Sequence, residues 1–189
     1  IQSKVKRQAP DGSPNFEPPY RVLSRDRALY VGDAVAAVFA ETLDQAKDAA
    51  EAIEIEWEPL AAVTETRTAA DDGGAELWPQ SPRNVCLVLD AGSRDAVEQA
   101  LASARHNVSV TYPINRITAV TMEPRTALGQ FDFVTEAYTL HCGLQNPHAV
   151  RESLANDIFR ISGNRVRVVA PDVGGGFGLK EAAFPEYVL

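Results

Sequence analysis

Four glycines within five positions constrain this chain more than any other feature of its sequence. Residues 174–178 read Gly-Gly-Gly-Phe-Gly, and they follow residues 165–170, where arginine and valine alternate as in a β-strand. Glycine has no Cβ, so such a loop reaches positive φ angles and lets backbone amides approach a ligand directly. The pattern predicts a strand that ends in a ligand-binding loop or, in the simpler interpretation, in a flexible turn before a helix.

Two common nucleotide-binding motifs do not fit this loop. A P-loop requires Gly-Lys followed by Ser or Thr, whereas Gly178 is followed by Leu179, Lys180 and Glu181. The dinucleotide fingerprint requires a small third residue, and that position is Leu179. We expect Lys180 and Glu181 in the first turn of a helix, whose dipole favours Glu181 and disfavours Lys180. An anion near the glycines would then compensate Lys180.

Capping residues and periodicity predict the remaining elements. Thr42 and Gln45 form a capping box for a helix that ends near residue 52, and Ser93 precedes a second helix that ends near residue 104. Pro147 begins a third helix. Apolar runs and alternation predict strands over residues 30–39, 53–58, 84–89, 108–112, 134–140 and 165–170.

Composition excludes several classes of protein. The net charge of −8 argues against a general nucleic-acid binder, and the longest apolar run, residues 34–40, is too short to cross a membrane. The two cysteines form no Cys-x-x-Cys pair, and His141 and His148 lack the spacing of a zinc site. We therefore expect a globular protein of a reducing compartment, the cytoplasm, without a disulfide framework or a zinc site.

Polar residues in two further segments could carry chemistry or only structure. Gln145 and Asn146 lie between a predicted strand and a predicted helix, where a side-chain amide can both donate and accept a hydrogen bond. Such amides also commonly cap backbone groups, and that alternative stays open. Glu123 and Arg125 lie in apolar surroundings, and we expect one of them to form an ion pair that fixes a turn.

Four short sequence blocks, listed at the end of this paragraph, occur in the chain in a characteristic order. Taken together in this order, they resemble the large subunit of the molybdenum hydroxylases, a family that comprises xanthine dehydrogenases, aldehyde oxidases and aerobic carbon monoxide dehydrogenases. The resemblance implies an α+β fold, with part of an α/β hammerhead domain in residues 1–63, a linker in residues 64–83, and the start of the molybdopterin-binding domain in residues 84–189. The blocks are residues 32–38 (GDAVAAV), 122–125 (MEPR), 145–148 (QNPH) and 166–181 (VRVVAPDVGGGFGLKE).

The resemblance also implies site residues. Gln145 matches a glutamine whose amide contacts an oxygen ligand of molybdenum, and Glu181 matches a position that orients the substrate. Gln145 and Phe177 lie near the metal without binding it. Leu179 replaces a glycine that is usual in xanthine dehydrogenases and aldehyde oxidases, which would narrow the site. The residues that match the loop around the molybdenum-pyranopterin cofactor are Gly175, Gly176, Phe177 and Gly178.

The implied activity is that of an oxidoreductase that hydroxylates an aldehyde or N-heterocycle, or oxidises carbon monoxide. Metal-bound hydroxide is the nucleophile and a sulfido ligand accepts the hydride. The resemblance implies that the pyranopterin is molybdopterin or its cytosine dinucleotide. It also implies partner subunits that carry iron–sulfur clusters and FAD, so that the full enzyme is a dimer of heterotrimers. The family's catalytic glutamate lies beyond the equivalent of Leu189, so no catalytic residue is expected in this fragment. The alternative is a non-catalytic binding or assembly module. We expect the isolated chain to fold its hammerhead part but to bind no molybdenum. We also expect uncovered apolar residues, with self-association or disorder near residues 172–189.

Overall fold

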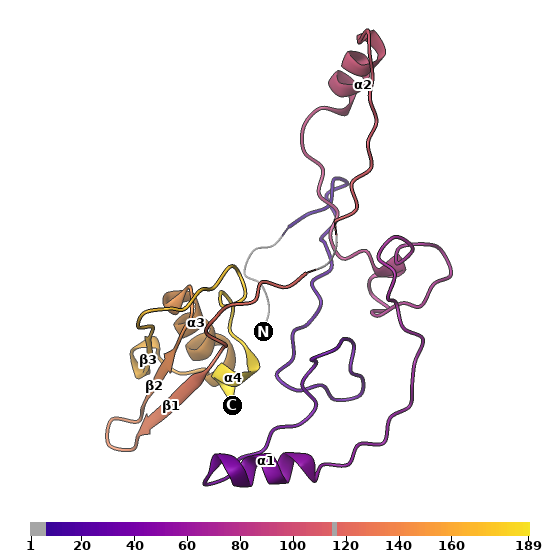
Figure 1. Ribbon diagram of the computed structural model, residues 1–189. Coiled ribbons are helices and arrows are strands. Elements are labelled where there is room, and N and C mark those ends of the chain that lie inside the picture. The colour runs from indigo at the N-terminus through magenta and orange to yellow at the C-terminus, as the bar shows by residue number, and fades with distance from the viewer. Residues whose placement is uncertain (1–6, 115–116) are drawn as a thin grey trace.

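The folded part of the molecule is a small α/β unit formed by residues 127–189, where the strands and two helices gather (Figure 1). The computed structural model describes residues 7–114 and 117–189. Strands β1 (Ala127–Asp132) and β2 (Ala137–Cys142) pair antiparallel, and β3 (Val166–Val169) lies parallel to β2. The sheet therefore has the order β1-β2-β3. The sequence predicted β2 and β3 within a few residues, but β1 was not predicted.

A helical crossover joins the two parallel strands, as parallel pairing requires. Helix α3 (Pro147–Glu152) begins with proline at its first position and continues into a π-helical segment, η2 (Ser153–Phe159). Arg160 ends this segment in the left-handed conformation, with φ 55°. A short turn, η3 (Gly163–Arg165), then leads into β3. The predicted helix at Pro147 is thus confirmed.

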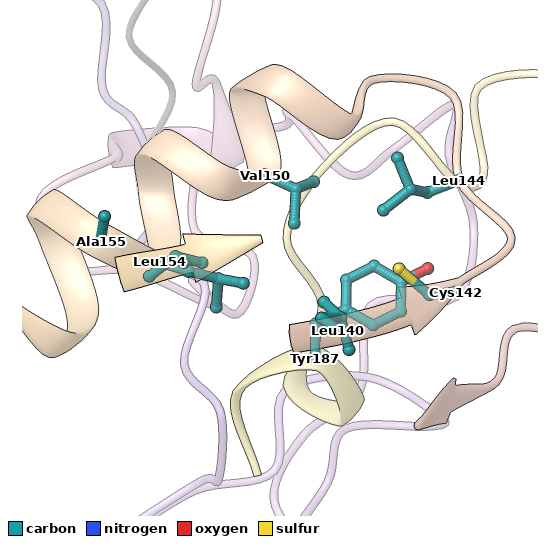
Figure 2. Close-up of a cluster of buried hydrophobic side chains, with 8 residues drawn as sticks. Leu140, Cys142, Leu144, Val150, Leu154, Ala155 and Tyr187 are labelled. Atoms are coloured by element: carbon teal, nitrogen blue, oxygen red, sulfur yellow. The ribbon is translucent and has the colours of Figure 1, made fainter. Parts of the chain in front are cut away.

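The hydrophobic core lies between this crossover and the sheet. In Figure 2, Val150 on α3 points toward β2, which carries Leu140 and Cys142. The ring of Tyr187 comes from the last helix, α4 (Pro185–Val188), and packs beside the same strand. The remaining buried members of the cluster are Leu144, Leu154, Ala155 and Val166.

The two predicted N-terminal helices are confirmed, and their caps explain their positions. Helix α1 (Leu43–Glu51) has the Thr42–Gln45 capping box, with both reciprocal hydrogen bonds present. Helix α2 (Arg94–Ser103) begins where the Ser93 hydroxyl accepts a hydrogen bond from the amide of Ala96. Neither helix buries a residue. The N-cap residues, and not packing against other elements, therefore account for where both helices begin. A short 3-10 turn, η1 (Pro82–Asn84), lies between them.

The strands predicted over residues 30–39, 53–58, 84–89 and 108–112 are not formed within the described chain. A strand needs a partner for its backbone groups as well as an alternating pattern, and no described segment pairs with these residues. Figure 1 shows α1 and α2 carried on long, irregular segments. Within residues 7–63 the structure contains helix α1 but none of the predicted strands, and the paired sheet lies in the C-terminal part. That the hammerhead part folds in the isolated chain stays a prediction.

Much apolar surface remains uncovered. The chain exposes 15156 Å² at a mass of 20.5 kDa, whereas a compact monomer of that mass exposes roughly 8,900 Å². The exposed large apolar side chains lie mostly between Tyr30 and Val134. Within residues 172–189, Ala183 and Tyr187 are buried, whereas Phe177 and Leu189 are exposed. Self-association or disorder near these residues stays a prediction. No helix of the described residues is long and apolar enough to cross a membrane.

Candidate functional site

The glycine-rich loop contains a tight turn with two left-handed residues. The amide of Leu179 donates to the carbonyl of Gly176 at 2.8 Å, which closes a four-residue turn. Its two central residues, Phe177 and Gly178, have φ angles of 49° and 85°. This pattern is common for glycine but strained for phenylalanine. The Phe177 side chain is 77% exposed, so burial of its ring does not offset that strain.

The Gln145 side chain holds this turn from the other side. Its backbone amide donates to the carbonyl of Lys180 at 2.9 Å, and its Oε1 accepts from the amides of Gly178 at 2.9 Å and Lys180 at 3.4 Å. Because Oε1 faces these donors, the amide nitrogen Nε2 points away, and it donates to none of the described residues. Gln145 is exposed and thus presents a hydrogen-bond donor that has no acceptor among residues 7–114 and 117–189.

Both amide side chains bind backbone groups, as the alternative interpretation expected: Gln145 binds amides of the loop, and Asn146 caps the helix. Asn146 Oδ1 accepts from the amide of Ala149 at 3.1 Å and forms the N-cap of α3. The two consecutive amide side chains therefore have separate roles. Asn146 satisfies the helix end, and Gln145 binds the loop about thirty residues further along the chain.

Lys180 is completely buried, and its charge is paired with a carboxylate. Its Nζ lies 2.5 Å from Oε2 of Glu123, which also accepts from the amide of Gly174 at 2.9 Å. The hydrogen bond from Lys180, with that from Gly174, holds the pKa of Glu123 below its ordinary value. The anion expected near the glycines is thus Glu123.

The predicted helix position of Lys180 and Glu181 is wrong. Residues 177–180 form a turn, and the next helix, α4, begins only at Pro185. Neither residue lies in the first turn of a helix, so no helix dipole favours Glu181 or disfavours Lys180 there. Glu181 is exposed beside the loop, whereas Lys180 points into the protein and cannot face a substrate.

Close packing restricts Gly174 and Gly176, whereas Gly175 and Gly178 have positive φ angles. A Cβ on Gly174 would lie 2.5 Å from Cβ of Glu123, and one on Gly176 would overlap the side-chain amide of Gln145. A Cβ on Gly175 would lie 2.9 Å from the Phe177 ring. Real Cβ atoms do not approach other atoms so closely, so larger residues would move the loop. Gly178 has open space around it, and its positive φ is the reason for glycine there.

Arg125 attaches the segment that carries Glu123 to the C-terminal helix. Its Nε lies 2.5 Å from Oε1 of Glu186, and its guanidinium lies 4.0 Å from the centroid of the Phe184 ring. Both Glu123 and Arg125 therefore form ion pairs, as expected for one of them. The pairs join segments far apart in the sequence instead of fixing a local turn.

The structure brings five of the six predicted site residues, Gln145 and residues 175–178, into one arrangement, and the sixth, Glu181, lies three positions further along the chain. Gln145 contacts the loop formed by residues 175–178, and Glu181 follows it on the exposed side. The backbone amides of Gly175, Gly176 and Phe177 donate to no described residue. Three successive free N–H groups and the Nε2 donor of Gln145 suit a polar or anionic group. These residues therefore fit a molybdenum-pyranopterin cofactor.

Sequence reasoning assigned no site role to Glu123 or Lys180, although each lies next to a predicted site element. The separate signals were a lysine directly after a glycine loop and a carboxylate in an apolar segment. Their pairing across 57 positions was not predictable without the fold. Among residues 7–114 and 117–189, no group of three or more histidine, cysteine or acidic side chains could hold a metal ion directly.

Comparison with known proteins places the chain in a class. Residues 77–189 match the molybdopterin cofactor-binding domain, and residues 3–61 match the a/b hammerhead domain of aldehyde oxidase and xanthine dehydrogenase. The chain belongs to this family of molybdenum-cofactor-binding large subunits, as the resemblance implied, and its α+β fold class is confirmed.

Several individual proteins of this family are similar to the chain. The chain is 34% identical to the nicotine 6-hydroxylase large subunit of Paenarthrobacter nicotinovorans and 29% identical to the carbon monoxide dehydrogenase large chain of Hydrogenophaga pseudoflava, over 89% and 88% of its length. It is similar to the crystal structure of quinoline 2-oxidoreductase from Pseudomonas putida 86, with a TM-score of 0.76, 31% identity and 91% coverage. The chain spans 20%, 22% and 22% of these proteins, about a fifth of their length.

Proposed function

We propose that this chain forms part of the cofactor site of a molybdenum-dependent hydroxylase, in which the loop of residues 175–178 and Gln145 hold the molybdenum-pyranopterin. The observation that carries the proposal is the Gln145 side chain, whose oxygen is fixed by two loop amides while its nitrogen has no acceptor among the described residues. A capping glutamine would use its oxygen on a helix end. This one keeps a donor directed away from the protein backbone.

Each part of the site has a distinct task in this proposal. The free amides of Gly175, Gly176 and Phe177 would donate to the cofactor without adding charge, and Gln145 Nε2 would add a neutral donor. Phe177, exposed and strained, would cover the bound group and exclude water from it. When bound, the cofactor supplies the two-electron chemistry of substrate oxidation.

The substrate class is an aldehyde or an N-heterocycle. Two relatives above 30% identity are named for nicotine and quinoline, both nitrogen-containing aromatic rings. Glu181 is exposed next to the loop, where a carboxylate can accept a hydrogen bond from a ring N–H. Leu179, which is partly buried, would narrow the space beside Glu181 in this proposal.

The partners follow from the same family. Relatives are named as large subunits, large chains or members of a dehydrogenase complex. We infer separate iron–sulfur and FAD subunits, a dimer of heterotrimers and a cytoplasmic location. The domain division proposed from composition is residues 1–63, a linker at 64–83, and residues 84–189. The uncovered apolar surface between Tyr30 and Val134 is consistent with burial against further parts of such an assembly.

The test is purification of the natural subunit that contains this sequence, together with its co-expressed partner subunits. We expect about one molybdenum per subunit and reduction of an artificial electron acceptor by at least one N-heterocycle or aldehyde. A folded subunit that lacks molybdenum and oxidises no such compound would favour the non-catalytic binding or assembly module. Oxidation of carbon monoxide alone would overturn the proposed substrate class while leaving the cofactor assignment intact.

A further inference from the structure

Glu123 and Lys180 form a connection between the two halves of the candidate site. The Glu123 carboxylate accepts from the amide of Gly174, at the start of the glycine loop, and from Lys180 Nζ, at its end. The Glu123 amide also donates to the carbonyl of Gly174 at 3.4 Å. One side chain therefore holds both ends of the loop at a fixed separation.

Lys180 continues this connection to Gln145. Its carbonyl accepts from the amide of Gln145 at 2.9 Å, and its own amide donates to Gln145 Oε1 at 3.4 Å. The side chain of Lys180 is thus bound to Glu123 while its backbone is bound to Gln145. A change at Glu123 would reach the Gln145 amide through a single residue.

We infer that the Glu123–Lys180 ion pair is a positioning device that sets the shape of the glycine loop and the orientation of the Gln145 amide for the cofactor. This inference rests on the proposed function and assigns positioning roles to two residues beyond those that match the family's cofactor loop. Neither side chain would touch the cofactor: Lys180 is 0% exposed, and the Glu123 carboxylate is occupied by Lys180 and Gly174.

Two observations favour positioning over simple stabilisation. An ion pair with a buried member contributes little net stability compared with apolar side chains of similar size, because burial removes the hydration of that charge. Here Lys180 is the buried member, and the Glu123 side chain is 35% exposed. Its geometry is nevertheless strict, since each group must meet the other's hydrogen-bonding atoms. In addition, Gly174 cannot carry a Cβ without striking Glu123, so the loop is packed directly against the carboxylate that holds it.

The test compares Lys180→Met with the double variant Glu123→Gln/Lys180→Met in the complete natural subunit. Lys180→Met leaves Glu123 partly exposed and still bound to Gly174, so the subunit should fold. In the double variant no charge remains, and the glutamine still offers an oxygen to Gly174. Arg165→Met is the matched control, because it removes a cation from the Arg165–Glu136 pair outside the loop.

The main measurement is amide hydrogen exchange on the cofactor-free protein, in a loop peptide that covers residues 171–181 and a core peptide that covers residues 147–160. We expect both Lys180 variants to accelerate exchange in the loop peptide by ~10-fold while the core peptide stays at the wild-type rate. Molybdenum content should fall to ~10% of wild type. Arg165→Met should match wild type in both peptides and in metal content.

Three other results of this experiment would contradict a positioning role for the ion pair. Wild-type exchange in the loop peptide of both Lys180 variants would overturn it, and so would equal acceleration of the loop and core peptides, which would show a general stabilising role. Recovery of both loop exchange and metal content in the double variant would show that only charge balance matters. If wild-type subunit itself binds no molybdenum, the proposed function fails, but the exchange measurement still decides whether the pair positions the loop.

Discussion

Gln145 and Gly176 are packed so closely that no side chain can be added to Gly176 without displacing the Gln145 amide. We therefore expect Gly176→Ala to break the hydrogen bonds that Gln145 Oε1 accepts from Gly178 and Lys180. Overpacking of this kind typically costs about 1–3 kcal/mol. In the natural subunit, molybdenum content should fall much more than the melting temperature.

The control for this substitution is Gly129→Ala. Gly129 lies in β1, has no atom within 4 Å of an added Cβ and has no positive φ angle. It should retain wild-type metal content. Equal metal content in Gly176→Ala and Gly129→Ala would show that the contact with Gln145 does not shape the cofactor site.

Tyr187 provides a test of the core. Its ring packs within the hydrophobic cluster, but its buried hydroxyl has no hydrogen-bond partner among the described residues, and burial raises its pKa to about 12. An unpaired buried hydroxyl costs free energy. Tyr187→Phe should therefore leave the free energy of unfolding unchanged or raise it by up to about 1 kcal/mol, as measured by urea unfolding of the chain.

The matched variant Tyr187→Ala separates the ring from its hydroxyl. It removes the aromatic ring from the cluster and should lower the free energy of unfolding by about 3–5 kcal/mol. A loss above about 1 kcal/mol in Tyr187→Phe would instead reveal a partner for the hydroxyl that the described chain lacks.

The elements that sequence reasoning predicted well are those set by local signals. The capping box at Thr42, the N-cap at Ser93 and the proline at position 147 each mark a helix start in the structure. The alternating pattern of residues 53–58 likewise indicates an extended segment. A β-strand forms, however, only where a second segment provides backbone hydrogen-bond partners along its length. Pairing is a long-range property, and the pattern of one segment does not specify its partner.

In the candidate site, too, the residues carried by local motifs could be predicted, whereas a long-range contact could not. The glycine loop and Gln145 could be predicted because a short motif and its family resemblance carry them. The Glu123–Lys180 pair could not, because burial of Lys180 depends on how a turn at residues 177–180 meets a segment 57 positions earlier. The sequence did indicate that Lys180 needs an anion. It could not indicate which carboxylate supplies the charge.

Cys142 should be chemically inert in the folded chain. It is 4% exposed, and burial raises the pKa of its thiol to about 11, so the reactive thiolate is only ~0.1% of the population at pH 8. Cys86 is partly exposed and serves as the internal comparison. Iodoacetamide at pH 8 should label Cys86 alone, and both cysteines in urea, as shown by peptide mass spectrometry. Labelling of native Cys142 at the rate of Cys86 would contradict this burial.

Acid should loosen the attachment of the glycine loop. The pKa of Glu123 is lowered below its ordinary value of 4.5, mainly by the hydrogen bond from Lys180. A carboxylate with a lowered folded-state pKa contributes stability that is complete above the unfolded-state pKa and is lost as the pH falls through the folded-state pKa. Exchange of the loop amides, measured at equal intrinsic rates, should therefore accelerate below pH 4.5 relative to pH 6.

Two substitutions isolate the carboxylate responsible. Glu123→Gln cannot titrate and should flatten this pH dependence in the loop. Asp132 also has a lowered pKa, through the hydrogen bonds it accepts from Val134 and Thr135, but it is the last residue of β1, far from the glycine loop in the sequence. Asp132→Asn should therefore leave the pH dependence of the loop as in wild type. The same flattening in both variants would mean that acid acts on the whole fold.

The two hydrogen-bonding ends of the Gln145 side chain can be tested separately. Gln145→Glu keeps carboxylate oxygens that can accept from Gly178 and Lys180, but it loses the Nε2 donor. Gln145→Ala loses both functions. If the donor acts on the cofactor, Gln145→Glu should lower the turnover number of the complete enzyme by ~10²-fold, the usual effect of removing one preorganised donor. Its loop exchange should stay close to wild type.

Gln145→Ala should lower turnover as strongly and should also accelerate loop exchange, because the two backbone amides lose their acceptor. Steady-state kinetics normalised to bound molybdenum separate these effects from simple loss of cofactor. KM should change less than kcat in both variants, since the donor gains strength as charge develops in the transition state. Near wild-type turnover in Gln145→Glu, with a defect confined to Gln145→Ala, would show that Gln145 serves the loop alone and contributes no donor to the chemistry.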